Sequence, residues 1–420
     1  MSVLPYVFVF DFRGDEGGST IQFVMAGVSV LLTLYILSRY RFFLPDGFSK
    51  FLFYGLGALL VGFSSAIFFN VPVNQLIRVS LPFVLFVLSS WIGANVATDF
   101  INLRRFMGTC ITAGIVNSFF RYYWGLHYNS LGFDDVRYQI LTPIMPFLIS
   151  YCVVGVLFSR TIPIIPLLLS SWIVILSLLS VTRSLILTAV FGLFISFIYL
   201  FRIGARNPAL VPYAKWRLPS VAFFALMCVV GGSITAVMRP EVFNDWHERL
   251  FESKSTVDDI DITYMTRVAE AQGIWDQGIS SPVSFIFGRG FGSNYSWSSD
   301  YVEHMRRLSS DLANNMDQYW SGTHTIFTHG FLFGGVLGFL WVVYIYAFPL
   351  IRGYIAAIKL KNVFDPEYVR VYLIFNVSIF LFLSQSITSN PLGGERISAQ
   401  FLGLFCGIVV TLSRNLAFKI

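Results

Sequence analysis

Residues 321–340 read SGTHTIFTHGFLFGGVLGFL, and they join the longest polar segment of the chain to one of its many apolar runs. Apolar runs of about 18 or more residues recur along the whole sequence, and this is the length that an α-helix needs to cross a bilayer. Only 12% of the 420 residues are charged and 55% are hydrophobic, whereas soluble domains contain about 25% charged residues. The sequence therefore predicts an all-α, polytopic helical membrane protein.

Eleven apolar runs are predicted to span the membrane, and the run at 3–10 could add a shortened or re-entrant twelfth span. The eleven runs are 21–37, 51–69, 76–98, 106–120, 140–158, 162–181, 185–201, 219–237, 326–351, 371–388 and 398–412. A single large loop follows the eighth run. The chain thus divides into a helix bundle (1–238), a large loop or lid that carries active-site residues (239–325) and C-terminal membrane helices (326–420).

Lys and Arg cluster in alternate loops, such as those after the first and ninth runs. Because cytoplasmic loops are enriched in basic residues, this pattern predicts an external N-terminus and an internal C-terminus. The large loop then lies on the outer side, together with Arg183 and the segments 121–139 and 390–396. These loops account for the net charge of +6, so no nucleic-acid partner is expected.

His324 is the candidate catalytic residue because it lies where the large loop enters the ninth run. A helix N-terminus presents free N–H groups and a partial positive charge, which disfavours protonation of a nearby imidazole. A neutral imidazole is what a general base requires. The alternative is an interfacial histidine that hydrogen-bonds to a loop carbonyl.

Three arginines are candidates for binding a phosphate group near the membrane surface: Arg183, Arg267 and Arg289. A charged side chain is costly there unless it is paired or faces water, and guanidinium groups bind phosphate in a bidentate way. Structural alternatives are that Arg183 extends toward lipid headgroups and that Arg289 caps a turn. Residues 288–292, GRGFG, follow no βαβ pattern and are predicted to form a turn rather than a nucleotide site.

No metal or other cofactor is expected. The acidic run at 258–261 could suggest a metal site, but such runs are usually solvated. His324 and His329 are five residues apart, which suits a zinc pair poorly. Gly330, Gly334 and Gly338 are spaced by four and are predicted to form one small-residue face against which another helix packs.

The order of these residues resembles the bacterial O-antigen ligase and polymerase superfamily. The resemblance is carried by Arg267, Trp275, the glycines at 288, 290 and 292, and His324 at the head of a helix. His324-Thr325, nine residues, then Gly335 and Gly338 reproduce the spacing of the ligase motif. The sequence departs from that motif at Thr325 and Phe339, so ligase and polymerase remain alternatives.

The resemblance implies a metal-independent, inverting glycosyltransferase of GT-C-like fold at the periplasmic face of the bacterial inner membrane. Its donor would be an undecaprenyl-pyrophosphate-linked glycan, and its acceptor a second glycan or lipid A-core. His324 would take the proton of the acceptor hydroxyl, and Arg183, Arg267 and Arg289 would bind the pyrophosphate. Membrane lipids, and other polysaccharide-assembly proteins, are the remaining expected partners.

Within this class, a polymerase of a surface polysaccharide is favoured over an O-antigen ligase or a related protein O-glycosylation enzyme. A transporter or flippase of lipid-linked sugars is the alternative from another class. Transporters often contain repeated halves and broken helices, and the sequence indicates neither. A scaffold protein of an envelope assembly complex is a third possibility.

Overall fold

The computed structural model describes most of the chain. The described residues are 4–11, 20–39, 44–45, 47–127, 141–159, 163–180, 183–206, 217–238, 240–242, 244, 256–257, 260–298, 322–359, 366–387, 390–392 and 396–418. Every structural statement below concerns these residues.

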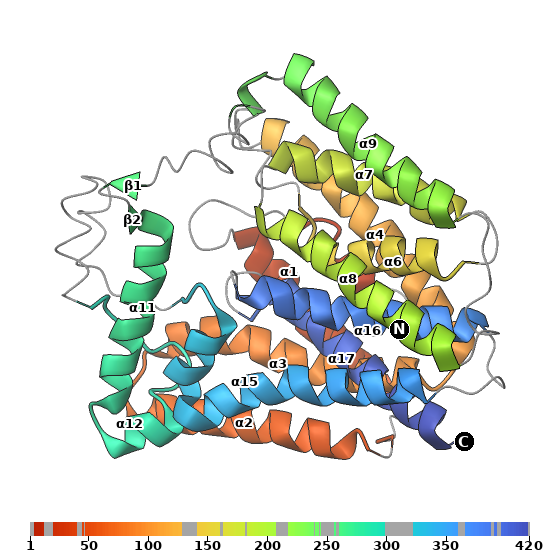
Figure 1. Ribbon diagram of the computed structural model, residues 1–420. Coiled ribbons are helices and arrows are strands. Elements are labelled where there is room, and N and C mark those ends of the chain that lie inside the picture. Colours follow the sequence, from red (N-terminus) through yellow and green to blue (C-terminus); the bar gives the residue numbers. More distant parts are fainter. Residues whose placement is uncertain are drawn as a thin grey trace.

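The described chain consists of helices and one short strand pair (Figure 1). The long helices before the lid are α1 (Thr20–Arg39), α2 (Ser49–Phe68), α3 (Val73–Val96), α4 (Phe100–His127), α6 (Met145–Leu157), α7 (Ile164–Ser180), α8 (Arg183–Arg206) and α9 (Arg217–Met238). The lid contains β1 (Thr256–Val257) paired antiparallel with β2 (Ile260–Asp261), then α11 (Ile262–Ile279) and α12 (Pro282–Phe287). The last helices are α15 (Ile326–Ile358), α16 (Pro366–Ser386) and α17 (Arg396–Phe418).

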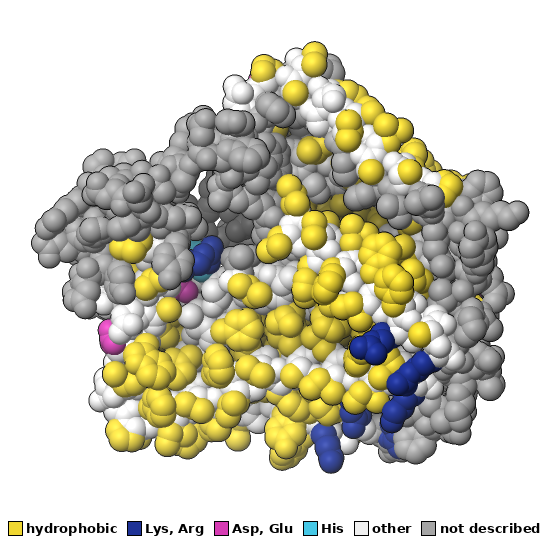
Figure 2. All heavy atoms as spheres, viewed as in Figure 1, with side chains coloured by type: hydrophobic (Ala, Val, Ile, Leu, Met, Phe, Trp, Pro, Cys, Tyr) yellow, Lys and Arg dark blue, Asp and Glu magenta, His cyan; other side chains and the backbone are white. Residues whose placement is uncertain are grey.

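Each of the eleven predicted spans coincides with one of these helices, which confirms the all-α polytopic class. Six described helices are long and apolar enough to cross a membrane, namely α2, α3, α8, α15, α16 and α17. Three further apolar helices are shorter, including α6 with 13 residues. The apolar surface in Figure 2 forms a broad band over these helices, as expected for a multi-pass protein embedded in lipid.

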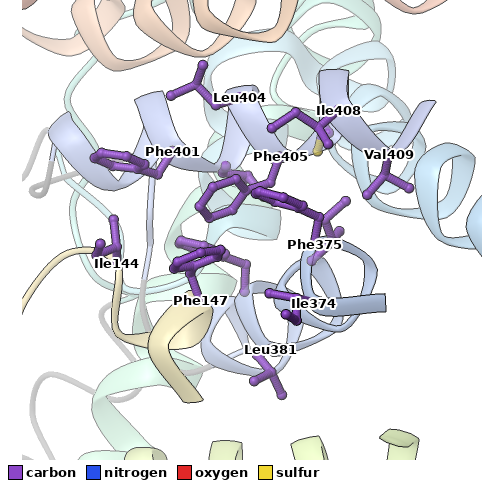
Figure 3. Close-up of a cluster of buried hydrophobic side chains, with 14 of the residues drawn as sticks. Ile144, Phe147, Ile374, Phe375, Leu381, Phe401, Leu404, Phe405, Ile408 and Val409 are labelled. Carbon is purple, nitrogen blue, oxygen red and sulfur yellow. The ribbon is translucent and has the colours of Figure 1, made fainter. Parts of the chain in front are cut away.

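The core of the bundle is the contact between α3 and α17. Carbonyl oxygens of α17 and α3 occupy the places where Gly93, Gly403 and Gly407 would carry a Cβ, so the two backbones touch. Small residues permit this close approach in membranes, where van der Waals packing replaces the hydrophobic effect between helices. Around it, aromatic and aliphatic side chains of α6, α16 and α17 interdigitate, with Phe147 stacked on Phe405 at 5.1 Å (Figure 3).

The short run near the N-terminus does not form a span. Residues Leu4–Phe8 form a single 3-10 turn that is buried against α4 and α17. Asp11 follows it and forms a buried ion pair of 2.7 Å with Arg121 of α4. Asn117 donates to the carbonyl oxygens of Phe8, Val9 and Asp11, so the backbone of this turn is satisfied inside the bundle.

One end of the bundle is basic. Arg104 and Arg370 pair with Glu367 at the start of α16, and Arg206 donates to the carbonyl of Ile358 at the end of α15. Figure 2 shows basic side chains gathered at this end. These described basic residues therefore lie at the end of the bundle away from α11 and α12 (Figure 1).

The longest helix, α15, is broken at Gly335. Gly335 has φ 57° and ψ −144°, which is not helical, and the chain folds back sharply at this point. Gly330 and Gly338 consequently face each other: the carbonyl oxygen of each lies against the α-carbon of the other. The sequence did not reveal this broken helix, so the expectation of an uninterrupted span was wrong here.

The turn at 288–292 is built against this break. In an unbroken helix the carbonyls of Leu332 and Phe333 would accept from the N–H groups four residues later. Here the backbone N–H groups of Arg289 and Gly290 donate to them at 2.9 and 3.0 Å. The three glycines of the turn have φ between 70° and 90°, and a Cβ on Gly288 would overlap with the backbone at Gly334 and Gly335.

The predicted face of Gly330, Gly334 and Gly338 is therefore only partly correct. Gly330 and Gly338 do permit close packing, but their partner is the other half of the same helix. Gly334 has no heavy atom within 4 Å of the place of its Cβ. The break places these glycines in a hairpin rather than on one straight face.

Adjacent glycines provide a matched test of the break. Gly335→Ala should lower the free energy of unfolding by about 1–3 kcal/mol, because Ala is strained at positive φ and its Cβ would overlap with the carbonyl of Phe285. Gly334→Ala should leave stability unchanged or slightly raised, since Ala favours helix and the site is open. Thermal unfolding in detergent measures both, and equal melting temperatures for the two variants would refute the break.

Candidate active site

His324 and Glu270 form a hydrogen-bonded pair where the lid meets the membrane helices. His324 directly precedes Thr325, the N-cap residue of α15, whose hydroxyl accepts from the N–H of Thr328 at 3.2 Å. Its imidazole Nδ1 lies 2.5 Å from Oε2 of Glu270 on α11. Glu270 is 1% exposed, whereas the side chain of His324 is 50% exposed. A buried carboxylate thus holds an accessible imidazole.

Glu270 acts as an acceptor toward several donors. The backbone N–H of His324 donates to Oε1 at 2.9 Å, and the hydroxyl of Thr328 lies 3.2 Å from the same oxygen. A carboxylate beside Nδ1 favours the tautomer with a proton on Nδ1, which leaves the lone pair of Nε2 free. The pair can therefore accept a proton at Nε2 while Glu270 stabilises the imidazolium that forms.

Tyr295 closes the inner side of this pair. Its hydroxyl donates to the carbonyl of Gly322 at 2.9 Å, which fixes the backbone two residues before His324. Burial, followed by the negative charge of Glu270, raises the pKa of Tyr295 above its usual value. The phenol therefore keeps its proton and remains a donor at neutral pH.

Arg267 lies one helical turn before Glu270 on α11. Residues three apart share a helix face, so the guanidinium is brought to the side where Glu270 holds His324. Its Nη1 is buried and has no hydrogen-bond partner among the described residues. The structure thus brings the predicted base close to one predicted arginine that retains an open donor.

Arg183 is the first residue of α8, and its side chain lies outside the described part of the chain. The start of α8 can still be placed. Thr188 of α8 lies 3.3 Å from Ser384 near the end of α16. The segment after α16 reaches the site, since Asn390 donates to the hydroxyl of Thr323 at 3.2 Å. The first turn of α8 is therefore at the same end of the bundle as His324.

Arg289 contacts the lid and the end of α2. Its guanidinium donates to Oε1 of Gln277 at 3.2 Å and lies over the ring of Phe69, 5.5 Å from its centre. Gln277 is two helical turns beyond Glu270 on α11, so these contacts place Arg289 farther along the lid than Arg267. In the described structure no contact joins Arg289 to His324.

His329 is not a partner of His324. It is 2% exposed and stacks on Phe83 at 5.4 Å, within an aromatic cluster that also contains Phe291, Phe333 and Trp341. Within the described ranges, no three His, Cys, Asp or Glu side chains come together as a metal site. Asp258 and Asp259 lie outside those ranges.

The sequence did not single out Glu270, Thr328 or Asn390. The available signal for Glu270 was its spacing of three from Arg267 on a predicted amphipathic helix. More than half of the acidic residues lie in the same large loop, so nothing distinguished this one as buried. Its partner is 54 residues away, and only the folded lid brings the two together.

The fold and this site define a multi-pass membrane protein with a His–Glu pair at the base of a lid. No family model and no curated protein sequence matches the chain.

Loss of the Glu270 carboxylate should release the segment around His324. In Glu270→Ala the N–H of His324 loses its charged acceptor, which is worth about 1.5–3 kcal/mol, so its exchange should be about 10–100-fold faster. Hydrogen–deuterium exchange of the peptide covering 322–330 measures this. Asp276→Ala removes an exposed carboxylate from the same helix and should leave that peptide unchanged; equal exchange in both variants would contradict the burial of Glu270.

Proposed function

We propose that the protein is a glycosyltransferase of the bacterial inner membrane that transfers or polymerises undecaprenyl-pyrophosphate-linked oligosaccharides at the periplasmic face. The observation that carries this proposal is the pair formed by a buried Glu270 and an accessible His324 at the start of a membrane helix. The pair has the form of a general base, and it lies where the lid meets the start of α15. The resemblance of the His324–Gly338 segment to O-antigen ligases and polymerases supports the same reaction.

In the proposed reaction, Nε2 of His324 takes the proton from a hydroxyl of the acceptor. The oxygen attacks the anomeric carbon of the donor sugar, and the bond from that carbon to the pyrophosphate oxygen breaks. Undecaprenyl pyrophosphate leaves with the bonding electrons, and the anomeric configuration inverts. Glu270 keeps Nδ1 protonated and stabilises the positive charge on the ring.

Charge develops on the pyrophosphate as it leaves, and cationic donors placed there lower the barrier. Arg267 has an unpartnered guanidinium N–H within the described structure, on the helix that carries Glu270. Arg183, at the end of the bundle where His324 lies, is the second proposed ligand. Both carry permanent charge, which suits a group that must bind a dianion at any physiological pH.

We favour a surface-polysaccharide polymerase, with an O-antigen ligase as the close alternative. Both reactions use the same base and the same leaving group, and they differ in the acceptor. A polymerase accepts a second lipid-linked glycan, and a ligase accepts lipid A-core.

A transporter or flippase of lipid-linked sugars is a second candidate, because the break in α15 is a feature of many transporters. The backbone groups released at this break are, however, bonded to the lid turn rather than directed into a cavity. A transporter would need no base, so His324→Ala would leave its activity nearly intact.

The deciding experiment uses purified protein in detergent with one lipid-linked oligosaccharide and a metal chelator. A ladder of longer lipid-linked products identifies a polymerase, and a product formed only after lipid A-core is added identifies a ligase. If the lipid-linked sugar is flipped across liposome membranes and neither product forms, the transporter replaces the glycosyltransferase as the proposed function. His324→Ala should abolish transfer, whereas His127→Ala, an exposed histidine on α4, should retain it.

Glu270→Gln tests whether the carboxylate of the His–Glu pair positions the base. The amide can donate to Nδ1 and thereby favour the wrong tautomer, so kcat should fall by about 10²–10⁴-fold while KM changes little. Steady-state transfer kinetics measure the two parameters separately. An unchanged kcat would show that the carboxylate takes no part in positioning the base.

A further inference from the structure

The lid carries a polar groove beside the His–Glu pair. The groove has a volume of about 470 Å³ and lies between one side of α11 and the segment that follows α12. Gly273, Asp276 and Gln277 of α11 line one wall, with Ser280 just after the helix, and the opposite wall contains Trp297 and Arg289. Its volume falls within the range of about 300–1,000 Å³ that is typical of small-molecule sites.

The groove runs in line with Glu270. Gln277 follows Glu270 by seven residues, which is about two helical turns, so both side chains lie on one face of α11. Gly273 lies between them and also lines the groove. It is therefore about one turn, roughly 5 Å along the axis of α11, from the residue that holds His324.

The walls of the groove are fixed by backbone contacts. The carbonyl of Ser296 occupies the place where Gly273 would carry a Cβ, and the N–H of Ser298 donates to the carbonyl of Ala269 at 3.2 Å. Arg289 is held by Gln277 on one side and by the ring of Phe69 on the other. A preformed site loses less conformational freedom when a ligand binds.

The lining of the groove suits the hydroxyl groups of a sugar. It offers a carboxylate, an amide, a guanidinium and several hydroxyls, so both acceptors and donors are present. One acidic and one basic side chain leave it without net charge, whereas a phosphate site would be expected to contain an excess of cations. Apolar residues, which dominate most small-molecule pockets, contribute little here.

We propose that this groove binds the saccharide chain of the substrate whose reacting hydroxyl lies at His324. The inference rests on the proposed glycosyl transfer and deepens it. It assigns Arg289 to the saccharide rather than to the pyrophosphate, and it makes Asp276 and Gln277 determinants of which sugar is accepted.

The test measures binding separately from transfer. The probe is the soluble oligosaccharide released by mild acid from the lipid-linked substrate, and saturation-transfer-difference NMR on the full-length protein in detergent detects it. The wild-type protein and His324→Ala should both transfer saturation to the sugar protons. Gln277→Leu and the shape-conserving Asp276→Asn should bind about tenfold more weakly, and in the transfer assay they should raise KM with kcat unchanged.

Ala271→Leu is the matched control. It introduces the same side chain on the same helix, but residue 271 is exposed, six positions from Gln277, and points about 120° away from it. This variant should bind the saccharide as the wild type does.

The two proposals fail in different ways. Absence of saturation transfer in the wild-type protein, or equal binding by Gln277→Leu and wild type, would overturn the groove while leaving transfer by His324 intact. A protein that binds the saccharide in the groove but never transfers it would overturn the proposed reaction and support the groove.

Discussion

The structure depends on two backbone hydrogen bonds that cross from the lid to a broken membrane helix. Where α15 folds back at Gly335, the carbonyls of Leu332 and Phe333 lose their helical donors, and no lipid can replace them. The backbone N–H groups of Arg289 and Gly290 donate to these carbonyls instead. These hydrogen bonds form only if the backbone of the turn comes very close to the backbone of α15. Gly288 permits this approach because it has no Cβ. The break, the lid and the placement of the first half of α15 are therefore one unit.

The candidate site follows from that unit. The half-helix before Gly335 presents His324 just ahead of its N-terminus, and α11, which is anchored through α12 to the same break, presents Glu270. The base is therefore positioned by α11 and the first half of α15, and α12 connects α11 to the break at Gly335. Its orientation is set by the fold rather than by the flexibility of a single loop. The polar face of α11 continues beyond the pair, which gives a substrate a path along the lid.

The membrane helices could be predicted from the sequence because their signal is local: an apolar run of sufficient length has few other structures available to it. His324 and Arg267 were predicted because they carry chemistry at a polar–apolar boundary. The break at Gly335 could not be predicted, since a glycine within an apolar run is equally compatible with close packing. Glu270 could not be predicted because its burial depends on a partner 54 residues away. The turn that carries Arg289 was predicted from its glycines, but the neighbours of this side chain, Gln277 and Phe69, are set by tertiary contacts.

The backbone contact between α3 and α17 has a consequence for how the protein is made. Ser29 of α1, the helix before α2 and α3, bonds to Gln400 of α17, and these residues are 371 positions apart. At the usual elongation rate of about 5–20 residues per second, α17 emerges roughly 20–70 s after the early helices. During that interval the face of α3 that contains Gly93 has no partner, although in the finished bundle it contacts the most buried helix, 94% of whose apolar window is enclosed. The early helices must therefore reside in the bilayer before the helix that covers this face has been made.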